Sequence, residues 1–334
     1  MRTLITGATG FIGSHVARAA LAAGEKVRVL IRRESSRTNI EGLPVEVATG
    51  NLTDHRSLEK AMRGCRRVYH VAALYSFSIR DPQRFHAVNV EGSRAVFDAA
   101  GQAGVERIVY TSSVAALAHP EAGRVVTEAT PVDPSRIIGA YKQSKYRAEQ
   151  VALEFAERGV PVVIVNPSFP VGPWDGKPTP TGQVIVDFLN RNMPAYVRTG
   201  MNLVDVEDVA QGHLLAAERG VIGERYILGG RNVTMKELLG MLSEITGLAA
   251  PRFCIPHAVV AAAAYANVAL CRVTGGAPRM TPDTARMARD PMYYDPAKAV
   301  GELGLPQSDP REALAKAVAW YLERGYVQRG PLRR

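Results

Sequence analysis

The chain has 334 residues, of which 46% are hydrophobic and 22% charged, values that exclude a largely disordered protein and suit one large α/β domain with an elaborated C-terminal part. Its formal net charge of +9 could suit nucleic acid, but the basic residues are scattered and no run interleaves them with aromatic side chains. We therefore expect no nucleic-acid partner. A phosphorylated cofactor, an anionic substrate or an acidic membrane surface also suits this charge.

The cysteines and the apolar segments indicate where the protein works. Cys65, Cys254 and Cys271 are far apart without metal-ligand spacing, so we expect reduced thiols, no metal site and a cytoplasmic protein. No secretory signal is expected, because glycine-rich sequence begins at Gly7. The apolar stretch Val259–Leu270 is shorter than the ~20 residues that cross a bilayer. It predicts either an alanine-rich packed helix or a helix that faces a lipid-like substrate or a membrane surface.

Strand-like and helix-like segments alternate through the first 166 residues. The expected strands are Arg2–Thr6, Val27–Ile31, Val45–Thr49, Val68–Ala72, Arg107–Thr111 and Val162–Val165. The expected helices are Phe11–Ala23, His55–Arg63, Pro82–Ala103 and Tyr141–Arg158. Apolar strands separated by helices are typical of a parallel sheet covered on both faces, so the sequence predicts a doubly wound α/β sheet of the Rossmann type.

The pattern changes after Asn166. Residues 167–181 contain five prolines and are expected to form a loop. Later elements are expected as helices at Val184–Asn190 and Asp208–Arg219, a strand at Arg225–Leu228, and a helix from the capping box Thr234–Glu237 to about Thr246. We expect residues 1–166 and about 182–228 to form the dinucleotide-binding domain. Residues 167–181 and 229–330 would form a smaller, mainly helical lobe that binds substrate.

A glycine signature joins the first strand to the first helix. Gly7 permits a tight turn, Gly10 lets backbone N–H groups approach a pyrophosphate, and Gly13 lets helix and strand pack closely. A glycine-rich turn without a ligand is the alternative, but the strand before and the helix after favour a cofactor. The candidate cofactor-binding residues here are Gly7, Thr9, Gly10, Phe11, Ile12 and Gly13.

The end of the second strand favours NADP over NAD. An acidic residue there would bind the ribose hydroxyls and repel a 2′-phosphate, whereas this chain has Arg32 and Arg33, with Arg37 nearby. A guanidinium binds phosphate with two parallel hydrogen bonds. The alternative is that these arginines are solvated surface residues.

Other strand ends supply the remaining cofactor candidates. They are Asn51 and Leu52 near the adenine, Val71, Ala72 and Ala73 near the ribose, and Pro167 and Ser168 after the sixth strand. His70, inside the fourth strand, is expected to be packed rather than catalytic.

Tyr141 and Lys145 are four residues apart and share one face of the expected helix. The ammonium would lower the pKa of the phenol and bind the nicotinamide ribose, so that Tyr141 exchanges a proton with a carbonyl or an alcohol. Ser113, at the end of the fifth strand, would hold the same oxygen by a hydrogen bond.

A second pair, Tyr294 and Lys298, has the same spacing. Pro296 prevents both from lying within one helix interior, since proline prefers the first turn. We expect Tyr294 to end a strand-like run, Asp295 to cap the following helix, and the pair to lie away from the nicotinamide end of the sheet.

Several motifs together resemble the extended short-chain dehydrogenase/reductase family. They are the glycine signature, Asn51-Leu52-Thr53-Asp54, His70-Val71-Ala72-Ala73, Asn89-Val90-Glu91-Gly92, Ser113 and the Tyr141/Lys145 pair. Arg32 and Tyr110–Ser113 resemble dihydroflavonol-4-reductases. The segments that closely resemble bacterial hopanoid-associated sugar epimerases are Val165–Pro173, Lys177–Gly182, Ile185–Asn190, Met193–Val197 and Gly223–Gly230. The resemblance implies a homodimer formed through the Pro82–Ala103 and Tyr141–Arg158 helices, and a role beside hopanoid lipid biosynthesis.

Two departures from these patterns concern the substrate. The segment Met201–Asp208 lacks the arginine with which sugar-nucleotide enzymes of the family neutralise a diphosphate, and Arg198 could replace it only if its loop reoriented. Ala118 stands where plant dihydroflavonol reductases carry an asparagine.

The candidate substrate residues are Tyr75, Phe77, Pro170, Trp174 and Tyr196, each of which could equally pack between the lobes. A pocket lined by them would suit a hydrophobic carbonyl compound. The leading hypothesis is an NADP-dependent carbonyl reductase or alcohol dehydrogenase. The alternatives are an NAD(P)-dependent sugar epimerase or dehydratase, and a dinucleotide sensor without catalysis.

Overall fold

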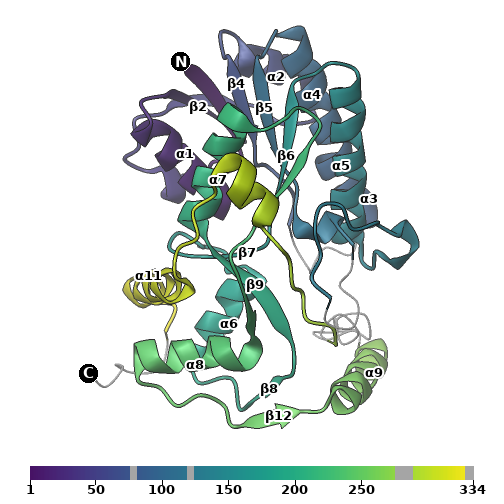
Figure 1. Cartoon of the computed structure of the whole chain (residues 1–334), viewed down its shortest axis with the longest axis vertical. Coiled ribbons are helices and arrows are strands. Elements are labelled where there is room, and N and C mark those ends of the chain that lie inside the picture. Colours follow the sequence, from purple (N-terminus) through teal and green to yellow (C-terminus); the bar gives the residue numbers. More distant parts are fainter. Residues whose placement is uncertain (76–80, 119–123, 275–288, 328–334) are drawn as a thin grey trace.

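The computed structural model describes residues 1–75, 81–118, 124–274 and 289–327. Seven parallel strands form the central sheet in the order β10-β6-β5-β4-β1-β2-β3 (Figure 1). Their bounds are β1 (Arg2–Thr6), β2 (Lys26–Ile31), β3 (Glu46–Thr49), β4 (Arg67–His70), β5 (Arg107–Thr111), β6 (Val162–Pro167) and β10 (Arg225–Leu228). The doubly wound parallel sheet predicted from the sequence is therefore confirmed.

Helices cover both faces of this sheet. On one face pack α1 (Phe11–Ala22) and α7 (Val206–Arg219), and on the other α2 (His55–Met62), α4 (Gly92–Gln102) and α5 (Ala140–Glu157). Each face has its own apolar core, because strands buried on both sides carry valine, isoleucine and leucine at successive positions. The expected Pro82–Ala103 helix is divided into α3 (Pro82–Phe85), a π-helical turn at His86–Glu91, and α4.

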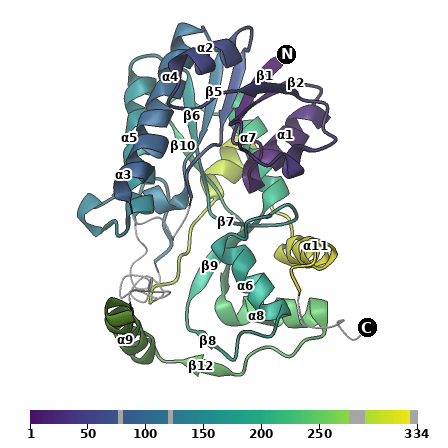
Figure 2. The same cartoon turned by 180° about the vertical axis from the view of Figure 1, so that it is seen from behind.

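A smaller lobe lies beyond the carboxyl ends of the sheet strands (Figure 2). Its helices are α6 (Pro180–Leu189), α8 (Met235–Thr246), α9 (His257–Thr274) and α11 (Pro310–Glu323). Its strands are β7 (Phe169–Val171), β8 (Ala195–Val197), β9 (Gly200–Asp205), β11 (Arg231–Thr234) and β12 (Phe253–Ile255), which pair as β11-β9-β7 and β12-β8. The capping box at Thr234 and Glu237 opens α8 as expected.

The small strands of this lobe correct the sequence prediction. Residues 167–181, expected as a loop, contain β7 and the start of α6. Pro170 is tolerated within β7 because that strand lies at the edge of its sheet, where a residue without an N–H group loses no ladder bond. The lobe remains mainly helical, as predicted, but its helices pack around two short sheets that the sequence did not predict.

Candidate functional site

The glycine signature forms a cradle that only glycine fits. Gly7 has φ +75°, and a Cβ there would stand 2.6 Å from the Ala72 backbone nitrogen; one on Gly13 would collide with the Gly7 carbonyl. Gly10 precedes α1 and no side chain caps that end. The first N–H groups of α1 are therefore left to bind an anion, and the residues present fit the pyrophosphate of a dinucleotide.

The other cofactor candidates lie at strand ends around this cradle. Arg32, Arg33 and Arg37 are exposed after β2, and Arg32 Nε lies 3.4 Å from a Glu34 carboxylate oxygen. Asn51 is exposed, whereas Leu52 packs in the core between the sheet and its helices. The backbone nitrogen of Ala72 donates to Thr6 Oγ1 at 3.2 Å, which fixes the end of β4 beside Gly7.

The two cofactor candidates after β6 lie at the junction between the central sheet and the smaller lobe. Pro167 is the last residue of the buried strand. The Ser168 hydroxyl donates to Asn202, at 2.8 Å from both the carbonyl and the side-chain oxygen of that residue. Ser168 therefore links the central sheet to β9 of the smaller lobe.

Ser113, Tyr141 and Lys145 converge beside the carboxyl end of β5. Tyr141 and Lys145 lie one turn apart on α5, and Ser113 caps a short 3₁₀ turn with Oγ 3.1 Å from the Ala115 nitrogen. The Lys145 ammonium donates to the Thr111 carbonyl at 2.8 Å and is 2% exposed. The three side chains that the sequence predicts as a group therefore lie close together in the structure.

Burial governs the electrostatics of the pair. Burial raises the pKa of Tyr141 to about 12, and a hydrogen bond with the Ser113 side chain opposes the rise. Burial lowers the pKa of Lys145 to about 8, and the charge of Glu149 opposes that fall. The pKa of Tyr141 thus lies above its usual value because burial is the larger effect, while the Lys145 ammonium donates to the Thr111 carbonyl.

Glu149, one further turn along α5, was missed by the sequence reasoning. Its side chain is fully buried, accepts from Asn166 Nδ2 at 2.6 Å and lies 3.5 Å from Arg225 Nη1. Asn166 Nδ2 also donates to the Ser113 carbonyl at 3.1 Å. The buried Glu149 carboxylate therefore acts on Lys145 through its charge, which raises the Lys145 pKa against the lowering by burial. It is also linked to the Ser113 carbonyl through hydrogen bonds of Asn166. Its i+4 spacing from Lys145 was the available signal, but the partners come from β6 and β10.

Asn89 connects the same helix to the end of β4. It lies in the π-helical turn, accepts from the Leu74 nitrogen at 2.6 Å and donates to Ser144 Oγ at 2.9 Å. His70 is buried between Thr6 Oγ1 at 2.7 Å and Ser93 Oγ at 3.0 Å, so it is packed, as expected. Burial lowers the His70 pKa to about 3, which keeps the ring neutral.

The candidate substrate residues are only partly gathered at the site. Tyr75 packs edge-on against Tyr141, with ring centroids 4.8 Å apart. Pro170 is half-buried in β7, and Tyr196 lies in β8 against the core of the smaller lobe. Phe77 lies outside the described residues.

Trp174 packs between two arginine side chains from different parts of the chain. The Arg18 guanidinium lies 4.2 Å and that of Arg324 5.3 Å from its ring centroid. Its carbonyl accepts from Asn39 Nδ2 at 3.0 Å. These contacts join α1 to α11 across the two lobes, the alternative that the sequence left open.

The second tyrosine–lysine pair is separated, as expected. Lys298 Nζ bonds to Glu224 at 2.5 Å, and Asp295 caps the following turn through the Ala297 nitrogen at 2.9 Å. However, Tyr294 is buried in the cluster that contains Val114, next to Ser113, so it does not lie away from the end of the sheet. It packs in the cluster next to Ser113 rather than opposite a lysine.

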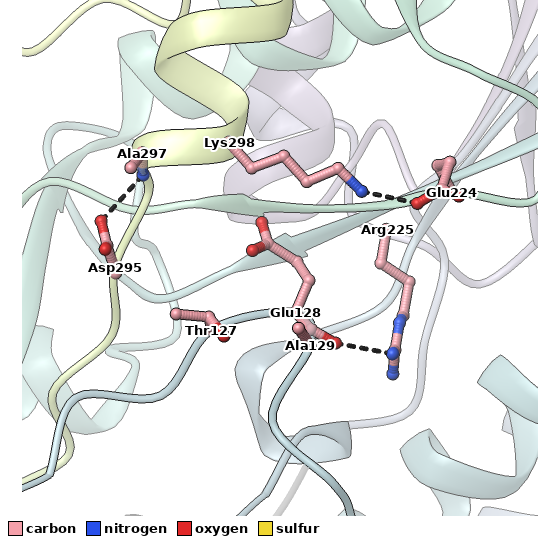
Figure 3. A pocket seen from close by; sticks show the side chains of 8 residues that line it. All are labelled: Thr127, Glu128, Ala129, Glu224, Arg225, Asp295, Ala297 and Lys298. Atoms are coloured by element: carbon pink, nitrogen blue, oxygen red, sulfur yellow. Dashed lines mark hydrogen bonds and ion pairs between the residues drawn. The ribbon is translucent and has the colours of Figure 1, made fainter.

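A hollow of about 430 Å³ opens beside β10 (Figure 3). It is lined by Thr127, Glu128, Ala129, Glu224, Arg225, Asp295, Ala297 and Lys298. Its charged groups are paired: Lys298 with Glu224, and Arg225 with the Glu128 carbonyl at 2.7 Å. None of the predicted site residues lines it, so it is separate from the predicted site. Among the described residues no cluster of histidine, cysteine and carboxylate side chains could hold a metal.

A Rossmann domain with a glycine cradle and a Ser–Tyr–Lys cluster at the strand ends defines a dinucleotide-dependent enzyme. Residues 3–229 match the NAD dependent epimerase/dehydratase family, and the chain belongs to it. A Synechocystis sp. protein provisionally named dihydroflavonol 4-reductase is 47% identical, with 97% of this chain and 95% of that protein covered.

Two further similar proteins extend over the whole chain. Sterol demethylase protein B of Methylococcus capsulatus is 39% identical over 98% of this chain and 100% of its own length. The crystal structure of gox2253 has a TM-score of 0.89 and 46% identity, covering 98% of this chain and 99% of that one. The likeness thus includes the smaller lobe.

Proposed function

We propose that the protein is an NADP-dependent reductase of a hydrophobic carbonyl compound, or the corresponding alcohol dehydrogenase, and that Ser113, Tyr141 and Lys145 are its catalytic residues. The observation that carries the proposal is the convergence of the Ser113 and Tyr141 hydroxyls beside a buried Lys145 at the end of β5. The resemblance to dihydroflavonol 4-reductase supports reduction as the net reaction.

The chain's own residues supply the proton chemistry. Tyr141 donates its phenolic proton to the substrate oxygen during reduction, because its raised pKa keeps it protonated at neutral pH. Ser113 donates a hydrogen bond to the same oxygen and fixes the carbonyl in place. Lys145 would contact the nicotinamide ribose. When bound, the cofactor supplies or accepts the hydride.

The exposed arginines after β2 support NADP. Arg32, Arg33 and Arg37 leave the end of β2 basic, and a 2′-phosphate there would gain charge-assisted hydrogen bonds. Exchanging Arg32 and Arg37 for serine should raise the Kd for NADPH at least about tenfold and leave that for NADH unchanged, by cofactor fluorescence. Equal loss for both cofactors would contradict the assignment.

Sugar epimerisation is the second candidate, favoured by the family to which residues 3–229 belong. Against it, every residue of β9 is buried and the strand contains no arginine for a diphosphate; Arg198 is exposed, beyond the end of β8. An epimerase would return its cofactor unchanged, whereas a reductase consumes NADPH in equal amount to product. Measuring NADPH consumption with ketones and with nucleotide sugars separates the two.

The name of the Methylococcus capsulatus relative refers to a sterol, a polycyclic lipid, and supports a lipid-like substrate here. We also propose a role beside hopanoid lipid biosynthesis, and a homodimer formed through the α3–α4 and α5 helices. Sedimentation equilibrium tests the dimer, and lipid extraction from a strain that lacks the protein tests the hopanoid role.

A further inference from the structure

Helix α9 exposes an apolar face to solvent. The exposed residues of its first three turns are Ala258, Val259, Ala262, Ala263, Tyr265 and Ala266, which share one side of the helix, while Val260 and Ala264 are buried on the other. A surface helix of a soluble protein normally presents polar side chains on its solvent side. Here the outward face has only the tyrosine hydroxyl as a polar side-chain group.

Strand β12, immediately before α9, extends this face. Phe253 is 75% exposed, Tyr265 61% and Val259 55%, values among the highest for large apolar residues in the described part of the chain. Both views show α9 and β12 at the far end of the smaller lobe (Figures 1 and 2). An exposed apolar patch of this kind marks an interaction surface.

In the described segments that carry the patch, the exposed charged side chains are basic. Arg198 directly follows β8 and Arg252 directly precedes β12, and both are exposed. Residues 191–199 and 247–274, which form this end of the lobe, contain no aspartate or glutamate. A two-fold contact with a second copy would bring these arginines together without an acidic partner, because the same patch meets itself in such a dimer. An acidic surface suits the charge.

We propose that the exposed face of α9, together with Phe253, docks on the surface of an anionic phospholipid bilayer. Phe253, Val259 and Tyr265 enter the boundary between headgroups and acyl chains, where tyrosine is favoured, and Arg198 and Arg252 contact the phosphates. The helix lies on the membrane: no helix in the described ranges is long and apolar enough to cross one. This inference does not depend on the proposed reaction.

Co-sedimentation of the full chain with vesicles tests the proposal. Wild-type protein should pellet with vesicles of phosphatidylcholine mixed with phosphatidylglycerol, and far less with phosphatidylcholine alone. The double variant Val259→Asp/Tyr265→Asp should lower the partition coefficient at least about tenfold. Arg198→Gln/Arg252→Gln should lower it roughly thirtyfold, from about 1 kcal/mol for each basic residue at an anionic surface.

Val221→Asp is the matched control. Val221 is 57% exposed in the turn between α7 and β10, so the variant adds the same charge to another exposed apolar site and should pellet like wild type. Thermal unfolding checks that each variant remains folded. The proposal is overturned if wild-type protein fails to pellet with the anionic vesicles, or if the Val221 variant loses as much binding as the α9 variant. It is equally overturned if the α9 variant converts a dimer to a monomer while still binding vesicles.

Discussion

Replacement of Glu149 by glutamine tests the buried network behind the proposed catalytic pair, Tyr141 and Lys145. The variant keeps an oxygen that can accept from Asn166 and removes the charge that faces Arg225 at 3.5 Å and, electrostatically, Lys145. At an effective dielectric of about 20, a pair at this separation is worth about 5 kcal/mol before desolvation. Burial, which raises the pKa of Glu149, offsets much of this, so we expect a net loss of about 1–3 kcal/mol in the free energy of unfolding.

The same change should alter the pH dependence of activity. Lys145 loses the negative charge that opposes the lowering of its pKa from burial, so this pKa should fall from about 8 by roughly one unit. The alkaline limb of kcat/KM then moves to lower pH by the same amount. Urea unfolding and the pH profile measure the two effects.

Glu106→Gln is the control for this experiment. Glu106 forms an exposed pair with Arg66 at 2.6 Å and should leave both the unfolding midpoint and the pH profile unchanged. If Glu149→Gln shifts neither quantity, the carboxylate has no electrostatic role. If the variant loses stability but the alkaline limb of its kcat/KM profile does not shift, Glu149 has only a structural role.

Three further substitutions test other parts of the account. Lys145→Met should abolish activity yet raise the free energy of unfolding at pH 7 by about 2 kcal/mol, because it removes a buried charge at the expense of one hydrogen bond to Thr111. In wild-type protein the unfolded state binds more protons than the folded state between pH 8 and 10.5, so Lys145 makes stability rise with pH there; denaturation of the variant should lack this rise. Gly13→Ala should abolish NADPH binding measured by fluorescence, because the new Cβ meets the Gly7 carbonyl, whereas Gly240→Ala in α8 has open space and should bind normally. Retained binding in the Gly13 variant would contradict the cradle.

The central sheet could be predicted from the sequence because most of its strands are short apolar runs that alternate with helix signals. β7, β8 and β12 could not: they are three residues long and contain or adjoin proline, and pairing partners far along the chain define them. β9 is six residues long and fully buried, but the polar Asn202 interrupts its apolar pattern, so the sequence did not predict it as a strand. That asparagine is satisfied by Gly230, Asn232 and Tyr294, contacts that no local pattern reveals.

In the candidate site, too, residues fixed by local sequence patterns could be predicted, and residues defined by distant partners could not. Ser113, Tyr141 and Lys145 could be placed because strand ends and helical spacing fix their positions. Glu149 could not be assigned a role, since Asn166 and Arg225 reach it from two strands that are adjacent only in the folded sheet. For Trp174 the sequence left open a place in the pocket or packing between the lobes, because the two arginines that flank its ring, Arg18 and Arg324, are far from it in the chain.

The most direct test of the central proposal follows hydride and proton together. Wild-type enzyme and Tyr141→Phe are incubated with NADPH deuterated at C4 and a panel of aryl and isoprenoid ketones, and the products are analysed by mass spectrometry. The account predicts one deuterium in the alcohol for each NADPH consumed, and a rate lower by about 10²–10⁴ in the variant. Unchanged turnover in Tyr141→Phe, or epimerised nucleotide sugar without net NADPH consumption, would contradict it.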